Sequence, residues 1–152
     1  MTILPITLTI AGAAVLLNLW IAIRVAVLRG RHKIMFGDGG NPALTARMRA
    51  QSNFIEYTPL FLILLALVEL ARGPSLWLWI AGIVFILARL VHVFGMDRPA
   101  PNPLRAGGMA LTFLPLLGLA IYAISVTYAD QRHHSSLNYA AQDPALSAAA
   151  TE

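Results

Sequence analysis

The stretch RMRAQSNFIEYTPLFLILLALVEL, residues 47–70, begins with charged and polar residues and continues as almost pure hydrocarbon. An α-helix of roughly 17–25 apolar residues crosses the ~30 Å hydrocarbon core of a bilayer. A helix satisfies its own backbone hydrogen bonds in lipid, and the stretch lacks the alternation of a barrel strand. The stretch therefore predicts a transmembrane helix whose first turns are polar and lie at one membrane surface.

Four apolar runs of this kind occur along the chain, at residues 3–28, 54–70, 76–94 and 106–128. The first run is too long for the core of a signal peptide and has no basic residue before it, so we interpret it as a membrane span. With the helical residues that flank them, the runs predict spans at about 3–28, 43–71, 75–95 and 105–128. We therefore expect an all-α membrane protein, a bundle of four transmembrane helices.

The composition agrees with a membrane protein of one domain. The 152 residues are 58% hydrophobic and 12% charged, whereas soluble domains average about 25% charged residues. The chain has no cysteine, which excludes a disulfide scaffold and a cysteine-metal site. Residues 1–128 are expected to form the membrane domain, and the polar, alanine-rich residues 129–152 are expected to form a mobile tail.

The basic residues indicate the orientation in the membrane. A net charge of +4 could suggest nucleic-acid binding, but the basic residues flank the apolar runs and form no stripe interleaved with aromatics. Two loops hold most of them, Arg29, Arg31, Lys33, Arg47 and Arg49 in the first and Arg98 and Arg105 in the third. Because basic loops stay in the cytoplasm, we expect loops one and three inside, both termini outside, and no nucleic-acid partner.

The connections carry capping and turn residues. Asn41 can cap the helix that follows it, and Pro42 suits the first position of that helix. Residues 97–104 hold three prolines and cannot be helix interior. Among the other polar groups, we interpret Arg24 as snorkelling toward the membrane surface and Glu69 as interfacial.

Arg49, Asn53 and Glu56 are spaced by four and three residues, so they share one face of the helix that opens the second span. They can present a cation, an amide and a carboxylate to one partner. A charge at the bilayer centre costs roughly 2.5–3.5 kcal/mol on insertion scales, so charges at a span need a reason. Two interpretations stay open: an internal salt bridge at the start of the helix, or a site for a zwitterionic ligand.

Two polar residues lie within the third span, and one precedes the fourth. Arg89 can pair with Glu56 inside the bundle, contact a ligand, or do both. His92 stands alone on an apolar face, where histidine is usually a hydrogen-bonded core residue, and no second histidine lies at ligand spacing in the bundle. We therefore predict no metal site. Arg105 is either an interfacial anchor or a ligand-binding cation.

All these polar groups, together with Arg29 from the first span, belong to the cytoplasmic ends of the four helices. We therefore expect a polar, mostly cationic pocket with one buried carboxylate at that end. Its ligand should be small and net anionic, and it should also carry an amine. Because the surrounding helices face lipid, a second, apolar substrate could arrive from the bilayer.

RAQSNFIEYTPLF, residues 49–61, resembles the signature of the MAPEG family, the membrane-associated proteins in eicosanoid and glutathione metabolism. The similarity covers roughly residues 5–128 and includes ARLVHVFGM at 88–96 and LRAGGM at 104–109 in the right order. The short FGDGG loop is similar to bacterial members. The resemblance implies a homotrimer of four-helix subunits in a bacterial inner membrane, with glutathione bound between neighbouring subunits at the cytoplasmic side.

The resemblance also implies roles for individual residues. Four positions would hold glutathione from one subunit: Arg49, Asn53, Glu56 and Tyr57. Gln51 and Arg29 match positions that reach in from the neighbour. Arg89 and His92 match polar positions on the third span, and Arg105 matches the arginine that faces the glutathione sulfur.

The activity that the resemblance implies is glutathione transfer to, or reduction of, lipophilic electrophiles and hydroperoxides. Leukotriene C synthase, a member of that family, has tyrosines where this chain has His92 and Met96, which leaves a second possibility open. The alternative is a non-catalytic relative that binds glutathione or a similar small anion without turnover. A small transporter or channel subunit is a weaker alternative, because no inverted repeat or interrupted helix is visible in the sequence.

Overall fold

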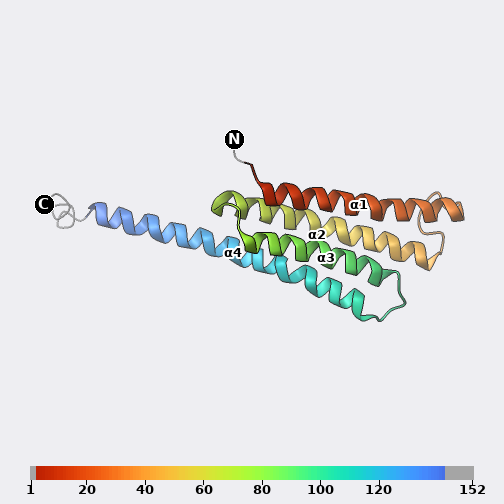
Figure 1. Cartoon of the computed structure of the whole chain (residues 1–152). Helices are drawn as coiled ribbons and strands as arrows, with labels where there is room; N and C mark the ends of the chain where they lie inside the picture. The colour runs from red at the N-terminus through yellow and green to blue at the C-terminus, as the bar shows by residue number, and fades with distance from the viewer. Residues whose placement is uncertain (1–2, 143–152) are drawn as a thin grey trace. The chain divides into compact units, whose positions relative to one another are not determined.

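The computed structural model describes residues 3–142, which form four helices and no strand (Figure 1). In chain order the helices are α1 (Pro5–His32), α2 (Pro42–Arg72), α3 (Leu76–Met96) and α4 (Pro103–Gln142). Each contains a segment long and apolar enough to cross a membrane, which in α4 is Pro103–Tyr128. The expected all-α membrane fold with four transmembrane helices is confirmed.

The chain divides into two compact units, residues 1–119 and 120–152. The first contains α1, α2, α3 and the first part of α4, and the second contains the rest of α4. Helix α4 stays helical to Gln142, whereas the sequence predicted a separate tail from residue 129. The mobility of that tail remains a prediction, and residues 143–152 lie outside the described part of the chain.

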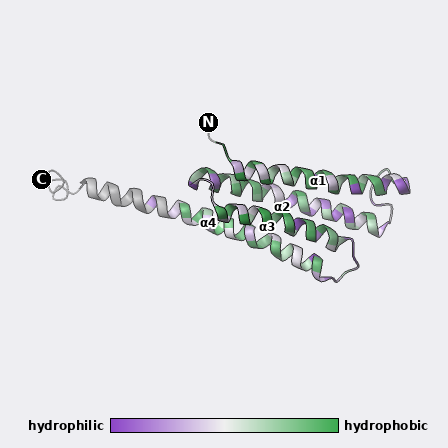
Figure 2. Cartoon of the chain, viewed as in Figure 1, coloured by the Kyte–Doolittle hydropathy of each residue, from purple (hydrophilic) through white to green (hydrophobic). Residues whose placement is uncertain are grey.

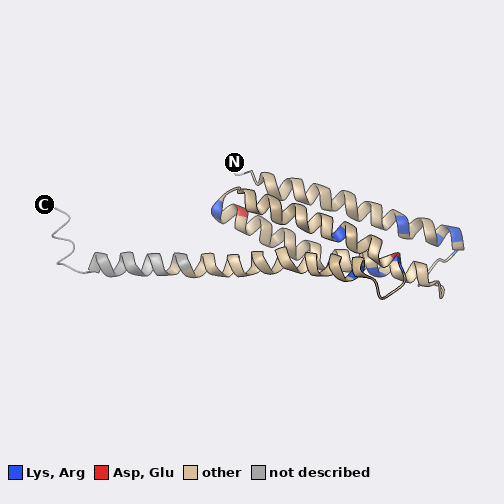
Figure 3. Cartoon of the chain, turned by 60° about the horizontal axis from the view of Figure 1, so that its bottom comes forward, with Lys and Arg blue, Asp and Glu red and all other residues tan. Residues whose placement is uncertain are grey.

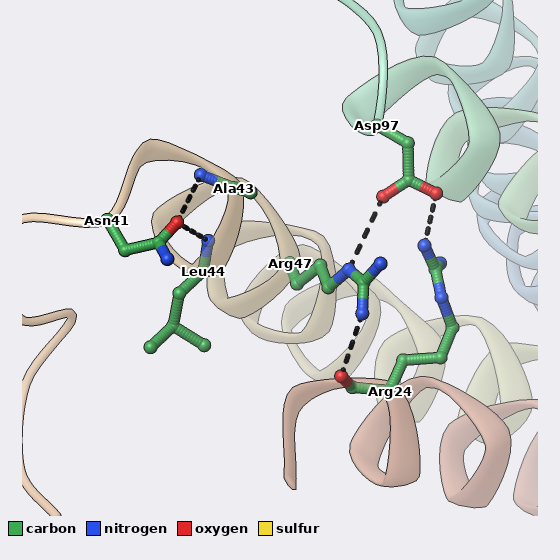
Figure 4. Close-up of polar contacts among 6 residues, drawn as sticks. All are labelled: Arg24, Asn41, Ala43, Leu44, Arg47 and Asp97. Carbon is green, nitrogen blue, oxygen red and sulfur yellow. Dashed lines mark hydrogen bonds and ion pairs between the residues drawn. The ribbon is translucent and has the colours of Figure 1, made fainter. Parts of the chain in front are cut away.

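Helix α2 begins as the sequence predicts. The side-chain oxygen of Asn41 accepts hydrogen bonds from the backbone N–H groups of Ala43, at 3.0 Å, and Leu44, at 3.2 Å (Figure 4). Pro42 occupies the first turn, where its missing N–H has no helical partner to lose. Leu44 is fully buried against Val25 and Leu28 of α1, so the capped end of α2 is also anchored in the core.

Helix α1 is capped by Glu69 from α2, a role that the sequence analysis did not predict. The Glu69 side chain is 2% exposed, and its carboxylate accepts hydrogen bonds from the backbone N–H of Ile6 at 2.9 Å and of Thr7 at 2.8 Å. It also accepts one from the Thr7 hydroxyl at 2.7 Å. The first N–H groups of a helix lack partners and carry a partial positive charge, so a carboxylate there is stabilised.

The surface of the first unit is largely hydrocarbon. Figure 2 shows hydrophobic residues along all four helices, and large side chains such as Leu16 (71% exposed) and Leu114 (68% exposed) point away from the core. Between the helices, Phe61 and Phe85 stack with ring centroids 3.9 Å apart. An apolar exterior around packed helices suits a lipid environment.

Candidate functional site

The candidate site lies at the end of the first unit that carries two of the connections (Figure 1). Residues 33–41 join α1 to α2, and residues 97–102 join α3 to α4. Figure 3 shows most of the Lys and Arg residues of the unit near this end. The predicted gathering of basic residues at one end of the bundle is therefore present, and its cytoplasmic orientation remains a prediction.

Asp97, the first residue of the α3–α4 connection, interacts with basic residues of α1 and α2. Its carboxylate forms an ion pair with the guanidinium of Arg24 from α1 and lies 3.8 Å from Nε of Arg47 from α2 (Figure 4). Arg47 also donates a hydrogen bond to the backbone carbonyl of Arg24 at 3.0 Å. Arg24 stacks over Trp20 at 4.7 Å from the ring centroid. The guanidinium of Arg24 therefore reaches the end of α3, where it pairs with Asp97. That this end lies at the membrane surface remains a prediction.

Asn102 fixes the start of α4. Its side-chain oxygen accepts a hydrogen bond from the backbone N–H of Arg105 at 2.9 Å. Its side-chain amide donates to the carbonyl oxygens of Gly95, at 2.9 Å, and Pro99, at 3.2 Å. One side chain thus caps α4 and ties it to the end of α3, which sets where the backbone of Arg105 lies.

Two glycines allow α3 and α4 to approach closely at this end. A Cβ atom added to Gly95 would lie 2.7 Å from Cα of Arg105, and one added to Gly108 would lie 2.6 Å from the backbone nitrogen of His92. Real Cβ atoms are not found that close to backbone. Neighbouring Gly107 has open space instead. The pair Gly95 and Gly108 therefore places His92 and Arg105 against each other.

His92 is 3% exposed and contacts the backbone of Arg105. Its Nδ1 lies 3.3 Å from the Arg105 carbonyl oxygen. Its other nitrogen, Nε2, is buried and has no hydrogen-bond partner in the described structure. The side-chain oxygen of Asn53 on α2 is also buried and has no hydrogen-bond partner in the described structure. Buried polar atoms normally have partners, and both of these residues also line the cavity at this end of the bundle.

A cavity of about 380 Å³ opens between α2, the α3–α4 connection and the start of α4. Its polar lining comes from Arg49, Arg105, Asn53, Asn102 and His92, and the rest is mostly apolar. The lining residues are Arg49, Asn53, His92, Met96, Ala100, Pro101, Asn102, Arg105, Ala106 and Met109. This volume lies within the range of small-molecule sites, roughly 300–1,000 Å³.

Two further hollows adjoin this cavity, and Arg49 lines all three. One, of about 530 Å³, contains Glu56 and Asp38, and the other, of about 560 Å³, contains Arg98 together with Arg105 and Asp38. Hydrogen bonds from the Thr45 hydroxyl and from a backbone N–H lower the pKa of Asp38, which keeps its carboxylate charged. The three hollows offer both signs of charge, with cations in excess.

The structure brings four of the predicted ligand-binding residues to one cavity, namely Arg49, Asn53, His92 and Arg105. Glu56 lines the adjoining hollow and is exposed, so the expected buried carboxylate is not buried within one chain. Tyr57 is half-buried and packs edge-on against Phe113, with ring centroids 5.4 Å apart.

Arg89 does not pair with Glu56 in this chain. It is fully buried over Phe54, at 5.8 Å from the ring centroid, and its three side-chain nitrogens have no hydrogen-bond partner in the described structure. No ion pair with Glu56 within 4.0 Å is present among the described residues. The internal salt bridge that the sequence left open is therefore not formed.

Two predicted residues do not line these hollows. Arg29 donates to the carbonyl oxygen of Met35 and to the sulfur of Met48, each at 3.4 Å. Gln51 is half-buried on α2 and lines none of the three hollows. Both residues are those that the resemblance assigns to a neighbouring subunit, and that assignment remains a prediction.

Sequence reasoning missed Asp97, Asn102 and Met109. Nothing in the sequence marked Met109 as a site residue, apart from its position one helical turn after Arg105. Asn102 could have been predicted as a helix cap. Asn102-Pro103 repeats the pattern of Asn41-Pro42, a capping residue followed by proline at the first helical position.

The fold and the site define an integral membrane protein with four helices and a cationic cavity at one end of the bundle. The family model of MAPEG matches residues 7–125. The chain belongs to the MAPEG family.

Two curated relatives are similar to this chain, both described as inner membrane protein YecN. One is from Escherichia coli strain K12 and is 31% identical over 93 residues, which cover 61% of this chain and 70% of the relative. The other is from E. coli O6:H1 strain CFT073 and has the same identity and coverage.

Proposed function

We propose that this protein is a glutathione-dependent enzyme of the bacterial inner membrane. It binds glutathione in the 380 Å³ cavity, activates it as the thiolate, and uses it on lipophilic electrophiles or hydroperoxides. The observation that carries the proposal is the cavity lining, to which Arg49, Arg105, Asn53 and His92 all contribute. Family membership and the inner-membrane relatives support the class and the location.

Glutathione suits the charges around this cavity. It is net anionic, so it needs cations such as Arg49, Arg105 and Arg98 of the adjoining hollow. It also carries an amine, for which Glu56 supplies an exposed carboxylate beside Arg49. Its amide groups suit the side-chain amide of Asn53, a residue that lines the same cavity. A neutral apolar ligand would leave these charges and polar atoms without partners.

The chemistry follows from the acidity of the thiol. A free thiol has a pKa of about 8.5, so only a few per cent is thiolate at neutral pH. If the positive charge of Arg105 lowered the pKa of the thiol by ~2, equivalent to about 2.7 kcal/mol, the thiolate would dominate at neutral pH. The thiolate then displaces a leaving group from an electrophile. Alternatively, it attacks a hydroperoxide to give an alcohol and a sulfenic acid, which a second glutathione converts to disulfide and water.

The assembly in this proposal is a homotrimer, in which Arg29 and Gln51 reach the cavity of a neighbour. Both lie outside the hollows of their own chain, and the resemblance assigns them to the neighbouring subunit. Lipid surrounds the bundle, and the apolar substrate enters the site from the bilayer. The basic connections at the site end lie in the cytoplasm, where glutathione is available to the cavity.

Ultraviolet difference absorption of the purified protein with glutathione tests the proposal. The wild type should give a thiolate signal, and Arg105→Ala should lose most of it. Arg72→Ala, at the opposite end of α2, is the matched control and should keep the signal. Absence of both binding and thiolate in the wild type would rule out the proposal.

A second candidate function is binding of glutathione without turnover. It is favoured by Met96, which lines the cavity, is 8% exposed, and offers no hydroxyl to the ligand. Glutathione binding without a thiolate signal would be the result expected from this alternative.

A further inference from the structure

The α1–α2 connection, residues 33–41, presents two large apolar side chains to the outside, next to the basic residues that end α1. We propose that this connection is a lipid-binding tip. Met35 and Phe36 insert among the headgroups of the membrane, and Arg31 and Lys33 bind the phosphates of anionic phospholipids. This interaction goes beyond the proposed function and does not depend on it.

The two apolar side chains are unusually exposed. Met35 is 81% exposed and Phe36 is 88% exposed, more than any other large apolar side chain among the described residues. Most of the other exposed apolar side chains lie on segments that are long and apolar enough to cross the membrane, where lipid covers them. Met35 and Phe36 lie outside those segments, and their removal from water would be favourable.

The packing of the connection holds these side chains outward. Ile34 turns inward and packs against the buried cluster of α1 and α2 that contains Leu44. It also covers Gly39, where an added Cβ would lie 2.8 Å from the Ile34 side chain. The Ile34 N–H donates to the Arg29 carbonyl at 3.0 Å. Because Ile34 is fixed on the inside, the next two residues are presented on the outside.

The connection lies at the level of the membrane surface. The apolar part of α1, residues 6–28, rises about 35 Å at 1.5 Å per residue, slightly more than the ~30 Å hydrocarbon core. The hydrophilic last turn of α1 therefore lies among the headgroups (Figure 2). The chain turns back at Lys33, which has a φ of 53°, and the Arg29 guanidinium donates to the Met35 carbonyl at 3.4 Å. Met35 thus stays near the level of that last turn.

The charge beside the tip is positive. Arg31 and Lys33 are exposed, and neither forms an ion pair with another described residue. The one carboxylate of the connection, Asp38, is already bonded to the Thr45 hydroxyl and the Gly40 N–H. Cations at the end of a helix also suit its dipole, but the dipole does not account for apolar side chains beside them. Apolar side chains next to free cations are typical of surfaces that bind anionic lipid.

Anionic lipid fits this surface better than a second copy of the chain does. Two copies that met through this tip would bring like charges together, which opposes association. A lipid leaflet offers an apolar layer to Phe36 and phosphates to the cations at the same depth. The membrane already surrounds the neighbouring helices, so the tip meets lipid at a high effective concentration.

A spin label can measure the depth of the tip, because the chain has no cysteine of its own. A nitroxide is attached to Phe36→Cys in the full-length protein, in nanodiscs of phosphatidylcholine with phosphatidylglycerol. Oxygen concentrates in lipid, whereas a charged nickel complex stays in water. We expect the label to collide more with oxygen than with nickel, as should one at Val27→Cys, a 45% exposed position on the α1 span. A label at position 36 that meets nickel as freely as a nitroxide in water would overturn the proposal.

The same label reports which lipid binds. Phosphatidylglycerol added to the labelled protein in detergent should slow the motion of the label in a saturable way, and phosphatidylcholine or inorganic phosphate should not. Replacing both cations, Arg31→Gln with Lys33→Gln, should weaken the apparent affinity at least fivefold, because each basic residue near an anionic surface contributes about that factor. Arg72→Gln, which removes a charge at the opposite end of α2, is the control and should leave the affinity unchanged.

Three results of this titration would overturn the proposal. Equal responses to phosphatidylglycerol and phosphatidylcholine would contradict recognition of the anionic headgroup. An equal response to inorganic phosphate would indicate a site for free anions. A label that is already immobilised before lipid is added would indicate a protein neighbour at the tip. Arg31 and Lys33 are exposed, so their replacement should not prevent folding, and the depth measurement requires neither change.

Discussion

Asp97 at the end of α3 forms an ion pair with Arg24 of α1, which lies 73 residues earlier in the chain. Neither side chain is freely exposed, with 16% of the Arg24 side chain and 32% of the Asp97 side chain accessible. The pair fastens the connection that carries Ala100, Pro101 and Asn102, three residues of the cavity wall. It therefore links the packing of α1 to the shape of the site.

Breaking this pair should lower both stability and ligand affinity. In a double-mutant cycle of Asp97→Asn and Arg24→Gln, we expect a coupling free energy of about 1 kcal/mol, at the upper end for pairs near a surface. Chemical unfolding in detergent measures it, and glutathione titration should show several-fold weaker binding for each single variant. A cycle with Arg31→Gln in place of Arg24→Gln should be additive. Additive effects in both cycles would mean that the pair contributes nothing.

Glu69 should be one of the most sensitive positions far from the site. Glu69→Gln places an N–H₂ group among the donors of Ile6 and Thr7, so at least one buried donor loses its acceptor. We expect a loss of about 2–4 kcal/mol in the free energy of unfolding, because these hydrogen bonds are buried and charge-assisted. Thr7→Val, which removes one donor only, should cost less. An unfolding curve for Glu69→Gln that overlays the wild type would contradict the capping role.

The close contact of α3 and α4 should make adjacent glycines behave differently. Gly108→Ala forces a methyl group against the backbone of His92 and should destabilise the protein by about 1–3 kcal/mol, as overpacking does. It should also weaken the thiolate signal, because Arg105 moves. Gly107→Ala meets nothing within 4 Å and should be neutral or stabilising by up to ~1 kcal/mol, since alanine favours helix. Equal effects of the two changes would refute the close approach.

Asp38 in the α1–α2 connection should titrate below its ordinary pKa of 3.8, chiefly because the Thr45 hydroxyl donates to its carboxylate at 2.6 Å. The folded state thus holds the charged form, and the stabilisation is present above the ordinary pKa and lost as pH falls through the lower, folded pKa. Thr45→Val should raise the pKa of Asp38, and Thr45→Ser should not. Carbon NMR of the Asp38 carboxyl measures both, and identical pKa values in all three proteins would disprove the cause.

Local chemistry allowed much of the fold to be predicted. Hydropathy alone placed four spans, because lipid leaves helix as the only sensible state for such runs. The pattern Asn41-Pro42 predicted the start of α2, since a cap and its first turn are neighbours in sequence. The C-terminal end of the last helix was not predicted, because α4 continues as helix through polar residues to Gln142.

The site was predicted in part. Arg49 and Asn53 share a helix face, which spacing reveals, and they meet in one cavity as expected. The partners of charged residues were not predictable in the same way. The sequence predicts Glu69 at the membrane interface and Arg24 reaching toward it, but not that Glu69 caps α1 or that Arg24 pairs with Asp97. Such partners are more than 60 residues apart, and no local pattern encodes their proximity.

The sequence by itself therefore determined the four apolar helices, the basic end of the bundle and the polar face of α2, because each depends on residues within a few turns of one another. Only the tertiary structure decided that Gly95 and Gly108 bring α3 and α4 into contact, and that the Arg105 carbonyl bonds one nitrogen of His92 and leaves the other free. These relations depend on how two helices cross, and the crossing is set by side-chain volume and hydrogen bonds between distant segments.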